Sequence, residues 1–256
     1  MRGIILEVKS CTLFSRRVAM FPDAVTVRGR RHIDELSRLS GSGIAGAILF
    51  LIQWPFSEFF MPEHHTDLEF SNTLCRAKEK IKIFPLSLSW NRDFSINLSQ
   101  VRILDIPWSI IEKEAKDRGS YLLLLRLPEE TTADVGSLGK VHFRSGYYIY
   151  IGSAKKNLSK RIERHKRLRK KLFWHIDHLR EIADFHVALP IRTQDALECE
   201  IAAAIKKVAE WEITRFGSSD CSCDSHLFGT LNDPLASPHF HSILQFYRME
   251  RLLKDL

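Results

Sequence analysis

The spacing of apolar residues predicts alternating strands and helices in the first part of the chain. Short apolar runs at 3–8, 44–52 and 81–88 are typical of strands, and the middle run is apolar enough to be a buried one. Between these runs, apolar residues recur at helical spacing over 28–40 and 67–80. Such alternation favours an α/β sheet. We therefore predict a first α/β domain over residues 1–110.

Further along, Pro107 and the charged segment 112–118 indicate a boundary, and a second α/β domain is predicted over 118–230. Two strands joined by a turn are expected to open it, followed by three helices; their ranges are 121–127, 146–152, 158–171, 173–182 and 195–213. Residues 231–256 are expected to form a C-terminal tail, with an amphipathic helix from residue 240 onward.

The positive charge of the chain is concentrated in one segment. The 256 residues contain 38 Lys and Arg against 31 Asp and Glu, a formal charge of +7. Residues 155–171 alone carry +9, so the remainder is slightly acidic. A concentrated run of this kind favours a phosphate backbone as partner, whereas a solvated helix face is the alternative interpretation.

The composition excludes disordered, collagen-like and membrane-spanning classes of protein. The apolar fraction of 45% suits a folded chain, and the longest apolar run, 43–54, is too short to span a bilayer. No signal peptide is visible at the start, so we expect a cytoplasmic protein without a membrane partner. Five scattered cysteines suit free thiols or metal ligands better than disulfides. No protein partner is predicted.

The first strand carries the motif Glu7-x-Lys9, whose two side chains project from the same face. A carboxylate that holds Mg²⁺ and an ammonium that orients a water are half of a metal-dependent phosphodiesterase site. Glu7 and Lys9 alone are weak evidence for such a site, because a solvent-exposed ion pair has the same spacing.

The run from Glu7-Val8-Lys9-Ser10 through Phe21-Pro22-Asp23-Ala24-Val25-Thr26 resembles the C-terminal part of the sugar fermentation stimulation protein (SfsA) family. This resemblance spans roughly the first 107 residues and implies a restriction-endonuclease-like fold. Family members carry a β-barrel and an acidic residue before the Glu-x-Lys strand, but residues 1–6 contain no acid. We therefore expect a truncated domain that binds nucleic acid, with a vestigial site of Glu7, Lys9 and Asp23 or Gln53.

In the second domain, period-two alternation places Tyr148 and Tyr150 on one face of a strand. A helical wheel of the basic run gives an inward apolar stripe that also contains Arg161 and His165. An inward arginine is costly unless it is paired, so these two residues are interpreted as site residues. The other basic residues are expected to bind nucleic acid: Lys155, Lys156, Lys160, Arg164, Lys166, Arg167, Lys170 and Lys171.

Two tyrosine strands, an Arg-x-x-x-His helix and a later helix glutamate resemble the GIY-YIG nuclease superfamily, more narrowly its Uri-type (DUF123) branch. The matching strings include Gly146–Ala154, Trp174–Leu179 and Phe216–Phe228. The resemblance implies a three-stranded antiparallel sheet flanked by helices and one divalent metal, Mg²⁺ or Mn²⁺.

The resemblance also implies roles for individual residues. Tyr121 and Tyr150 would line the site and help to deprotonate a water, Arg161 would stabilise phosphoryl charge, and His165 would assist proton transfer. A helix glutamate would hold the metal; Glu198 is preferred to Glu200 because Ile201 and Ala202 follow it at the family spacing.

Four potential soft metal ligands occur late in the second domain: Cys199, Cys221, Cys223 and His226. Together they could hold a structural Zn²⁺. Their spacing is not that of a standard zinc finger, so small core residues with a capping histidine are the preferred interpretation. The segment Trp174-His175-x-Asp177 is either a contact element or a packed helix start.

The function predicted from the sequence is Mg²⁺-dependent cleavage of DNA by the second domain. A non-catalytic DNA-binding or regulatory protein of the sugar fermentation stimulation type is the alternative, and a zinc-stabilised interaction module is the third.

Overall fold

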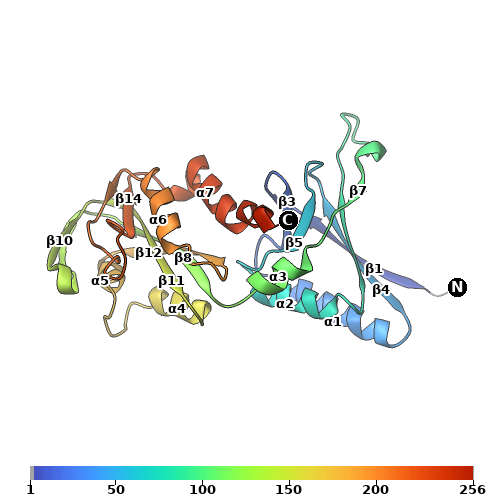
Figure 1. Cartoon of the computed structure of the whole chain (residues 1–256), viewed down its shortest axis with the longest axis horizontal. Helices are drawn as coiled ribbons and strands as arrows, with labels where there is room; N and C mark the ends of the chain where they lie inside the picture. The colour runs from blue at the N-terminus through green and yellow to red at the C-terminus, as the bar shows by residue number, and fades with distance from the viewer. Residues whose placement is uncertain (1–2, 256) are drawn as a thin grey trace. The chain divides into compact units, whose positions relative to one another are not determined.

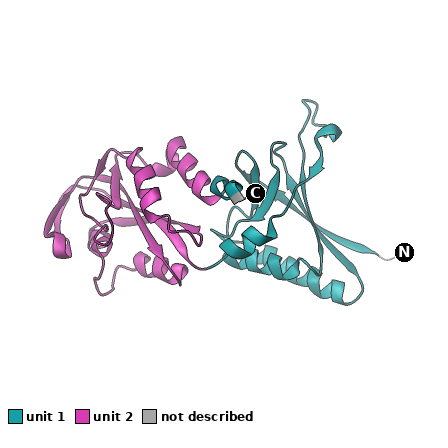
Figure 2. Cartoon of the chain, in the orientation of Figure 1, with its two compact units in different colours: residues 1–116, 249–256 teal, residues 117–248 magenta. Residues whose placement is uncertain are grey.

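A computed structural model describes residues 3–255, which form two compact units (Figures 1 and 2). Unit 1 comprises residues 1–116 and 249–256, and unit 2 comprises residues 117–248. The tail predicted over 231–256 is divided between them: α7 (Pro238–Arg248) lies in unit 2, and a 3₁₀ helix over Glu250–Asp255 lies in unit 1. Among the described residues no helix has both the length and the apolar character needed to cross a membrane.

Unit 1 is built on a four-stranded sheet in the order β1-β4-β6-β7, in which β1, β4 and β6 are parallel. The bounds of these strands are Ile4–Cys11, Ala45–Ile52, Lys82–Ser87 and Arg102–Ile103. A second small sheet contains β2 (Leu13–Phe14), β3 (Val18–Phe21) and β5 (Phe59–Pro62). The predicted α/β alternation is therefore confirmed.

Helices of unit 1 pack against these sheets. Helices α1 (Val27–Gly41) and α2 (Leu68–Ala77) lie side by side, as Figure 1 shows. Their buried side chains pack in one core with those of β4. Their N-termini are capped by Thr26 and Asp67, whose side chains accept backbone N–H bonds at 3.0 and 2.9 Å. Helix α3 is Trp108–Glu114.

Unit 2 is built on a five-stranded antiparallel sheet in the order β12-β8-β11-β14-β13. Its strands are β8 Gly119–Leu127, β11 Gly146–Ala154, β12 Asp184–Arg192, β13 Trp211–Glu212 and β14 Leu227–Thr230. A hairpin of β9 (Thr131–Asp134) and β10 (Lys140–Phe143) stands beside it. The three-stranded sheet that the resemblance implied is extended by two strands.

Helices cover both faces of the unit 2 sheet, as the period-two pattern of β11 requires. Tyr148 and Tyr150 face α4 (Leu158–Lys166) and α5 (His175–Ile182) in one core, whereas Ile149 and Ile151 face α6 (Glu198–Lys206) and α7 in the other. This arrangement leaves the tyrosine side of the sheet in contact with the basic helix.

Two predicted helices of unit 2 are shorter in the structure than expected. The helix predicted over 158–171 ends at Lys166, and Leu168, expected in its inward stripe, is exposed. The side chain of Lys170 caps the C-terminal end of this helix, because its Nζ donates to the carbonyl of His165 at 3.1 Å. The helix predicted over 195–213 ends at Lys206, since Trp211 and Glu212 pair with β14.

Candidate active site in unit 2

A polar cavity of about 330 Å³ opens beside the tyrosine side of the unit 2 sheet. Four residues that the sequence nominated line it together: Tyr121 from β8, Tyr150 from β11, Arg161 from α4 and Glu198 from α6. Side chains from four separate elements thus converge on one space of the size of a small ligand site.

The two tyrosines reach the cavity through the pairing of β8 with β11. Tyr121 is opposite Gly152, and a side chain at Gly152 would place its Cβ 2.5 Å from the Tyr121 hydroxyl. Glycine is therefore required for the Tyr121 ring to cross β11. The ring centroids of Tyr121 and Tyr150 lie 6.4 Å apart, and both side chains are almost fully buried.

Arg161 is held at the cavity by a hydrogen bond and by an aromatic ring. Its Nη1 donates to the backbone carbonyl of Ser153 at 2.5 Å, and its guanidinium lies 5.1 Å from the centre of the Trp174 ring. Asp117 fixes the start of α4 by accepting from the Ser159 backbone N–H at 3.0 Å. The arginine predicted to point inward does so, and its side chain lines the cavity.

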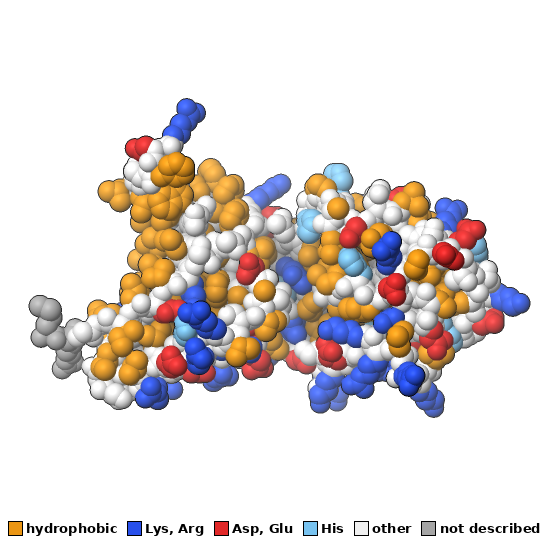
Figure 3. Space-filling model, turned by 180° about the vertical axis from the view of Figure 1, so that it is seen from behind, with side chains coloured by type: hydrophobic (Ala, Val, Ile, Leu, Met, Phe, Trp, Pro, Cys, Tyr) orange, Lys and Arg blue, Asp and Glu red, His pale blue; other side chains and the backbone are white. Residues whose placement is uncertain are grey.

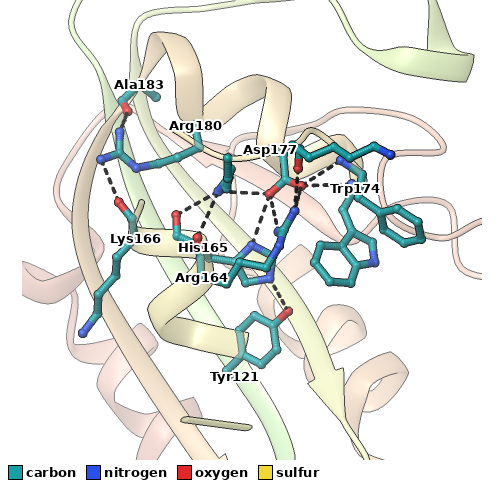
Figure 4. A network of polar contacts seen from close by, with 11 residues as sticks. Tyr121, Arg164, His165, Lys166, Trp174, Asp177, Arg180 and Ala183 are labelled. Carbon is teal, nitrogen blue, oxygen red and sulfur yellow. Dashed lines mark hydrogen bonds and ion pairs between the residues drawn. The ribbon is translucent and has the colours of Figure 1, made fainter. Parts of the chain in front are cut away.

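His165 joins Tyr121 to a buried carboxylate, as Figure 4 shows. Nε2 of His165 lies 3.0 Å from the Tyr121 hydroxyl, and Nδ1 lies 3.5 Å from Oδ1 of Asp177. Because the carboxylate favours a proton on Nδ1, Nε2 is the acceptor and the tyrosine hydroxyl the donor. The three side chains form a continuous polar chain leading to the cavity.

Asp177 also forms ion pairs with Arg164 and Lys170, two cations expected on the outer face of the helix. Arg164 donates to both carboxylate oxygens at 3.0 and 2.9 Å, and Lys170 lies 3.0 Å from Oδ1 with its side chain 6% exposed. The predicted position of Arg164 and Lys170 on the outer face of the helix is therefore wrong, and their role in nucleic-acid binding stays a prediction. Their physical role is to neutralise a fully buried acid.

The other basic side chains predicted for nucleic acid lie exposed. They are Lys155, Lys156, Lys160, Lys166, Arg167 and Lys171. Figure 3 shows Lys and Arg side chains gathered along the margin of unit 2 where α4 lies. We call these six residues the basic surface.

Burial changes the protonation of the site. It raises the pKa of Tyr121, against the opposing effect of Arg161, and it raises the pKa of Tyr150 well above the usual range. Burial likewise lowers the pKa of His165, which Asp177 only partly offsets. Without a cation in the cavity, both tyrosines are therefore neutral hydroxyls and His165 is a neutral imidazole at neutral pH.

Glu198 lies at the first turn of α6 and is partly exposed to the cavity. Its carboxylate accepts hydrogen bonds from the Ser153 hydroxyl and from Nδ1 of His226, the latter at 3.2 Å. Glu200, the alternative metal ligand, is exposed and is absent from the cavity lining. The geometry therefore favours Glu198 over Glu200.

The residues present fit a hard divalent cation. Mg²⁺ typically takes one or two protein carboxylates and keeps several waters. Glu198 supplies one carboxylate and the exposed Asp220, which also lines the cavity, could supply a second. Asp220 was not predicted, because nothing in its loop sequence distinguishes it from a surface acid.

Two further residues with clear roles were missed or left undecided by sequence reasoning. Trp174 lies under two guanidinium groups, with its ring centre 5.1 Å from Arg161 and 4.4 Å from Arg164. Asp177 is the counter-charge for α4. The string Trp174-His175-x-Asp177 was noticed, but only the folded chain shows that Asp177 faces His165.

The soft ligands of unit 2 also come together. Sulfur atoms of Cys199, Cys221 and Cys223 and a ring nitrogen of His226 all lie within 4.8 Å of one another. Cys199 is exposed and the other two cysteines are half-buried, so the interpretation of these thiols as small core residues is wrong.

In unit 1, Glu7 and Lys9 of the Glu-x-Lys motif form an ion pair with each other. Glu7 Oε1 lies 2.7 Å from Lys9 Nζ and 2.6 Å from His32 Nδ1, so His32 completes a triad that the sequence did not nominate. Asp23 is exposed and accepts from Thr12 at 3.2 Å, and Gln53 bonds Ser10 and Trp90. Among the described residues, Glu7 and Asp23 do not belong to a group of three or more potential metal ligands, and the vestigial site stays a prediction.

Comparison with known proteins finds one family model that matches part of each unit. Residues 1–94 match the sugar fermentation stimulation protein RE domain, and residues 120–246 match the domain of unknown function DUF123. Sugar fermentation stimulation protein homologs from Methanothermobacter thermautotrophicus and Methanosphaera stadtmanae are 38% and 40% identical over 106 and 107 residues.

Each of these two alignments covers 41% of this chain and 44% of the relative, so the chain spans less than half of either relative. A solved structure of Pyrococcus furiosus SfsA in complex with Ca²⁺ is 32% identical with a TM-score of 0.37, and the match covers 40% of this chain and 44% of that one. Residues 1–94 are therefore similar to the SfsA RE domain, and residues 120–246 are similar to the DUF123 domain.

Proposed function

We propose that unit 2 is a metal-dependent endonuclease that hydrolyses phosphodiester bonds in DNA, with Mg²⁺ or Mn²⁺ as cofactor. The observation that carries the proposal is the convergence of Tyr121, Tyr150, Arg161 and Glu198 on one polar cavity. A cation that can bind phosphate and a carboxylate that can hold a metal ion are groups that metal-assisted phosphodiester hydrolysis uses, and two hydroxyls beside them can position a water.

Arg161 and Glu198 have complementary tasks in this proposal. The Arg161 guanidinium would bind a non-bridging phosphate oxygen, since its planar fork matches phosphate and its backbone anchor at Ser153 fixes its direction. Glu198 would hold the cation, which when bound supplies positive charge that acidifies a coordinated water and stabilises the developing phosphorane charge. The Ser153 and His226 hydrogen bonds orient the Glu198 carboxylate for this purpose.

The neutral tyrosines act first as hydroxyl groups that position the substrate and the water. Tyr121 would take a proton from the attacking water while its own hydroxyl proton moves to Nε2 of His165, and the resulting imidazolium would be stabilised by Asp177. This polar chain provides a route by which a proton leaves the cavity without a phenolate being present in the resting site.

DNA would be held along the basic surface outside the cavity. Phosphate contacts by exposed lysines release counterions and make affinity depend on salt. The Lys155→Ala, Lys156→Ala double variant is expected to reduce the slope of log K against log[salt] by about 2, measured by fluorescence anisotropy with duplex DNA. A matched double variant of exposed unit 2 lysines outside the basic surface, Lys140→Ala with Lys207→Ala, should leave the slope unchanged. An unchanged slope in the first variant would exclude these lysines from the DNA contact.

The proposal is tested by incubating plasmid, single-stranded and branched DNA with the protein and Mg²⁺ or Mn²⁺. Cutting by the wild type is expected to be lost with EDTA and to fall about 10²-fold or more in Glu198→Gln. Glu200→Gln, two residues along the same helix, is the matched control and should retain activity. Equal cutting by wild type and Glu198→Gln would place the chemistry elsewhere.

Salt-sensitive DNA binding without cutting, under every metal tried, would instead favour the non-catalytic regulatory protein. The buried and hence neutral tyrosines are compatible with that outcome, because they need no metal to remain packed.

A further inference from the structure

Three thiols and one imidazole of unit 2 lie close together, and none of them lines the proposed catalytic cavity. Nε2 of His226 lies 3.5 Å from the Cys221 sulfur and 4.0 Å from the Cys199 sulfur. In a tetrahedral zinc site, bond lengths of about 2.3 Å to sulfur and about 2.05 Å to nitrogen set ligand atoms roughly 3.6–3.8 Å apart. The two nitrogen–sulfur separations lie on either side of this range, and all four ligand atoms lie within 4.8 Å of one another.

The four residues come from parts of the fold that fix them independently. Cys199 is in the first turn of α6, and His226 immediately precedes β14. The backbone of His226 is held on both sides: its N–H donates to the carbonyl of Phe216 at 2.8 Å, and its carbonyl accepts from Ile151 at 2.9 Å. Cys221 and Cys223 lie on the irregular loop between these anchors.

His226 is oriented like a metal ligand. Its side chain is 2% exposed, Nε2 faces the sulfurs, and Nδ1 lies 3.2 Å from Oε1 of Glu198. A carboxylate that accepts the second ring N–H is the usual partner of a metal-bound histidine, since it fixes the tautomer that leaves Nε2 free to bind. A histidine that served only to pack in the core would not be expected to have three thiols around Nε2.

We propose that Cys199, Cys221, Cys223 and His226 bind one structural Zn²⁺. Three thiolates and one imidazole form a closed tetrahedral set, with no position left for water, which is typical of structural zinc. The site is chemically distinct from the Glu198 cavity, which offers oxygen ligands to a hard cation. It stands whether or not unit 2 cleaves DNA.

The zinc site would shape the cavity through two connections. His226 donates to Glu198, so a ligand of the zinc ion is hydrogen-bonded to the proposed Mg²⁺ ligand. Gly217, Ser219 and Asp220 line the cavity just before Cys221, so an ion that anchors this loop also holds one wall of the cavity. Gly217, at φ +73°, packs against the Tyr150 ring, where an added Cβ would lie 2.8 Å from it.

The test begins with metal analysis of the full chain purified without added zinc. Wild-type protein is expected to contain about one zinc per chain, and Cys223→Ser to lose most of it. Cys75→Ser, which removes a half-buried thiol in unit 1, is the matched control and should retain about one. Less than about one-fifth of an equivalent in the wild type, or full zinc in Cys223→Ser, would overturn the proposal.

A second measurement guards against a variant that fails to fold. Replacing the bound ion of the wild type with Co²⁺ should give intense thiolate charge-transfer bands with the visible spectrum of a tetrahedral site, and octahedral spectra would overturn it. Two further outcomes are decisive against zinc: iron in place of zinc in the purified protein, or a mass two hydrogens low, which would show a disulfide within the cluster.

The failure of the proposed function is distinguishable from the failure of this inference. Glu198→Gln should abolish cutting and yet retain zinc, because Glu198 does not contact the ion. Zinc content unchanged in a protein that cuts no DNA would leave the zinc site established and remove only the nuclease proposal.

Discussion

Replacing Asp177 by Asn is expected to lower the free energy of unfolding by about 3 kcal/mol. The carboxylate is fully buried and neutralises Arg164 and Lys170, and it also accepts backbone N–H bonds from Phe173 and Trp174 at 3.0 and 3.1 Å. Removing its charge leaves the Lys170 ammonium buried without a counter-ion, which is more costly than losing an exposed ion pair. Urea denaturation followed by circular dichroism measures the loss.

The effect of Asp177→Asn should depend on pH in a defined direction. Burial opposes ionisation of Asp177, but hydrogen bonds from His165, Arg164, the Trp174 backbone and Lys170 outweigh it and hold its pKa well below the usual range. A depressed pKa gives stability that is fully present above the unfolded pKa of about 3.9 and is lost as the pH falls toward the folded value. The difference between wild type and variant should thus be constant from about pH 5 to 7 and shrink below about pH 4.

Glu163→Gln is the control for Asp177→Asn, because Glu163 lies on α4, beside Arg164, in an exposed pair with Lys166. It should change stability by no more than about 0.5 kcal/mol. A loss below about 1 kcal/mol for Asp177→Asn would show that Arg164 and Lys170 find other partners.

The sequence predicted the parts of the site that depend on local periodicity. Alternation along β11 placed Tyr148 and Tyr150 on one face of the strand, and the helical wheel separated Arg161 from the other basic residues of the predicted helix. Both inferences used the spacing of residues within one element, where geometry follows directly from 3.6 or 2 residues per repeat.

Features that depend on contacts between distant elements were beyond that reasoning. The wheel assumed that the helix continued to residue 171, so it placed Lys170 on the outer face; in the fold the helix ends at Lys166 and Lys170 turns back to Asp177. Likewise β12 was missed, since its alternation is weak and its place beside β8 is decided by tertiary pairing. The Cys and His ligands were considered, but only the loop path shows that they meet.

A conservative change at Arg161 should have a large effect on the proposed catalysis, because the proposed role uses the planar guanidinium fork and not only its charge. Arg161→Lys is expected to reduce kcat for DNA cleavage about 10²-fold while changing DNA affinity less than about threefold. A lysine ammonium cannot both reach the Ser153 carbonyl and bind a phosphate oxygen in the same plane, and it stacks less well on Trp174. Single-turnover cleavage and binding titrations at one salt concentration separate the two effects.

Lys160→Ala is the matched control, since Lys160 precedes Arg161 on the same helix but belongs to the basic surface. It should weaken binding in a salt-dependent manner and leave kcat within about twofold of the wild type, because phosphate contacts outside the cavity act on substrate and transition state alike. The opposite result, with Arg161→Lys weakening only affinity and Lys160→Ala lowering kcat, would mean that the reacting phosphate lies on the outer face of α4 and not in the cavity.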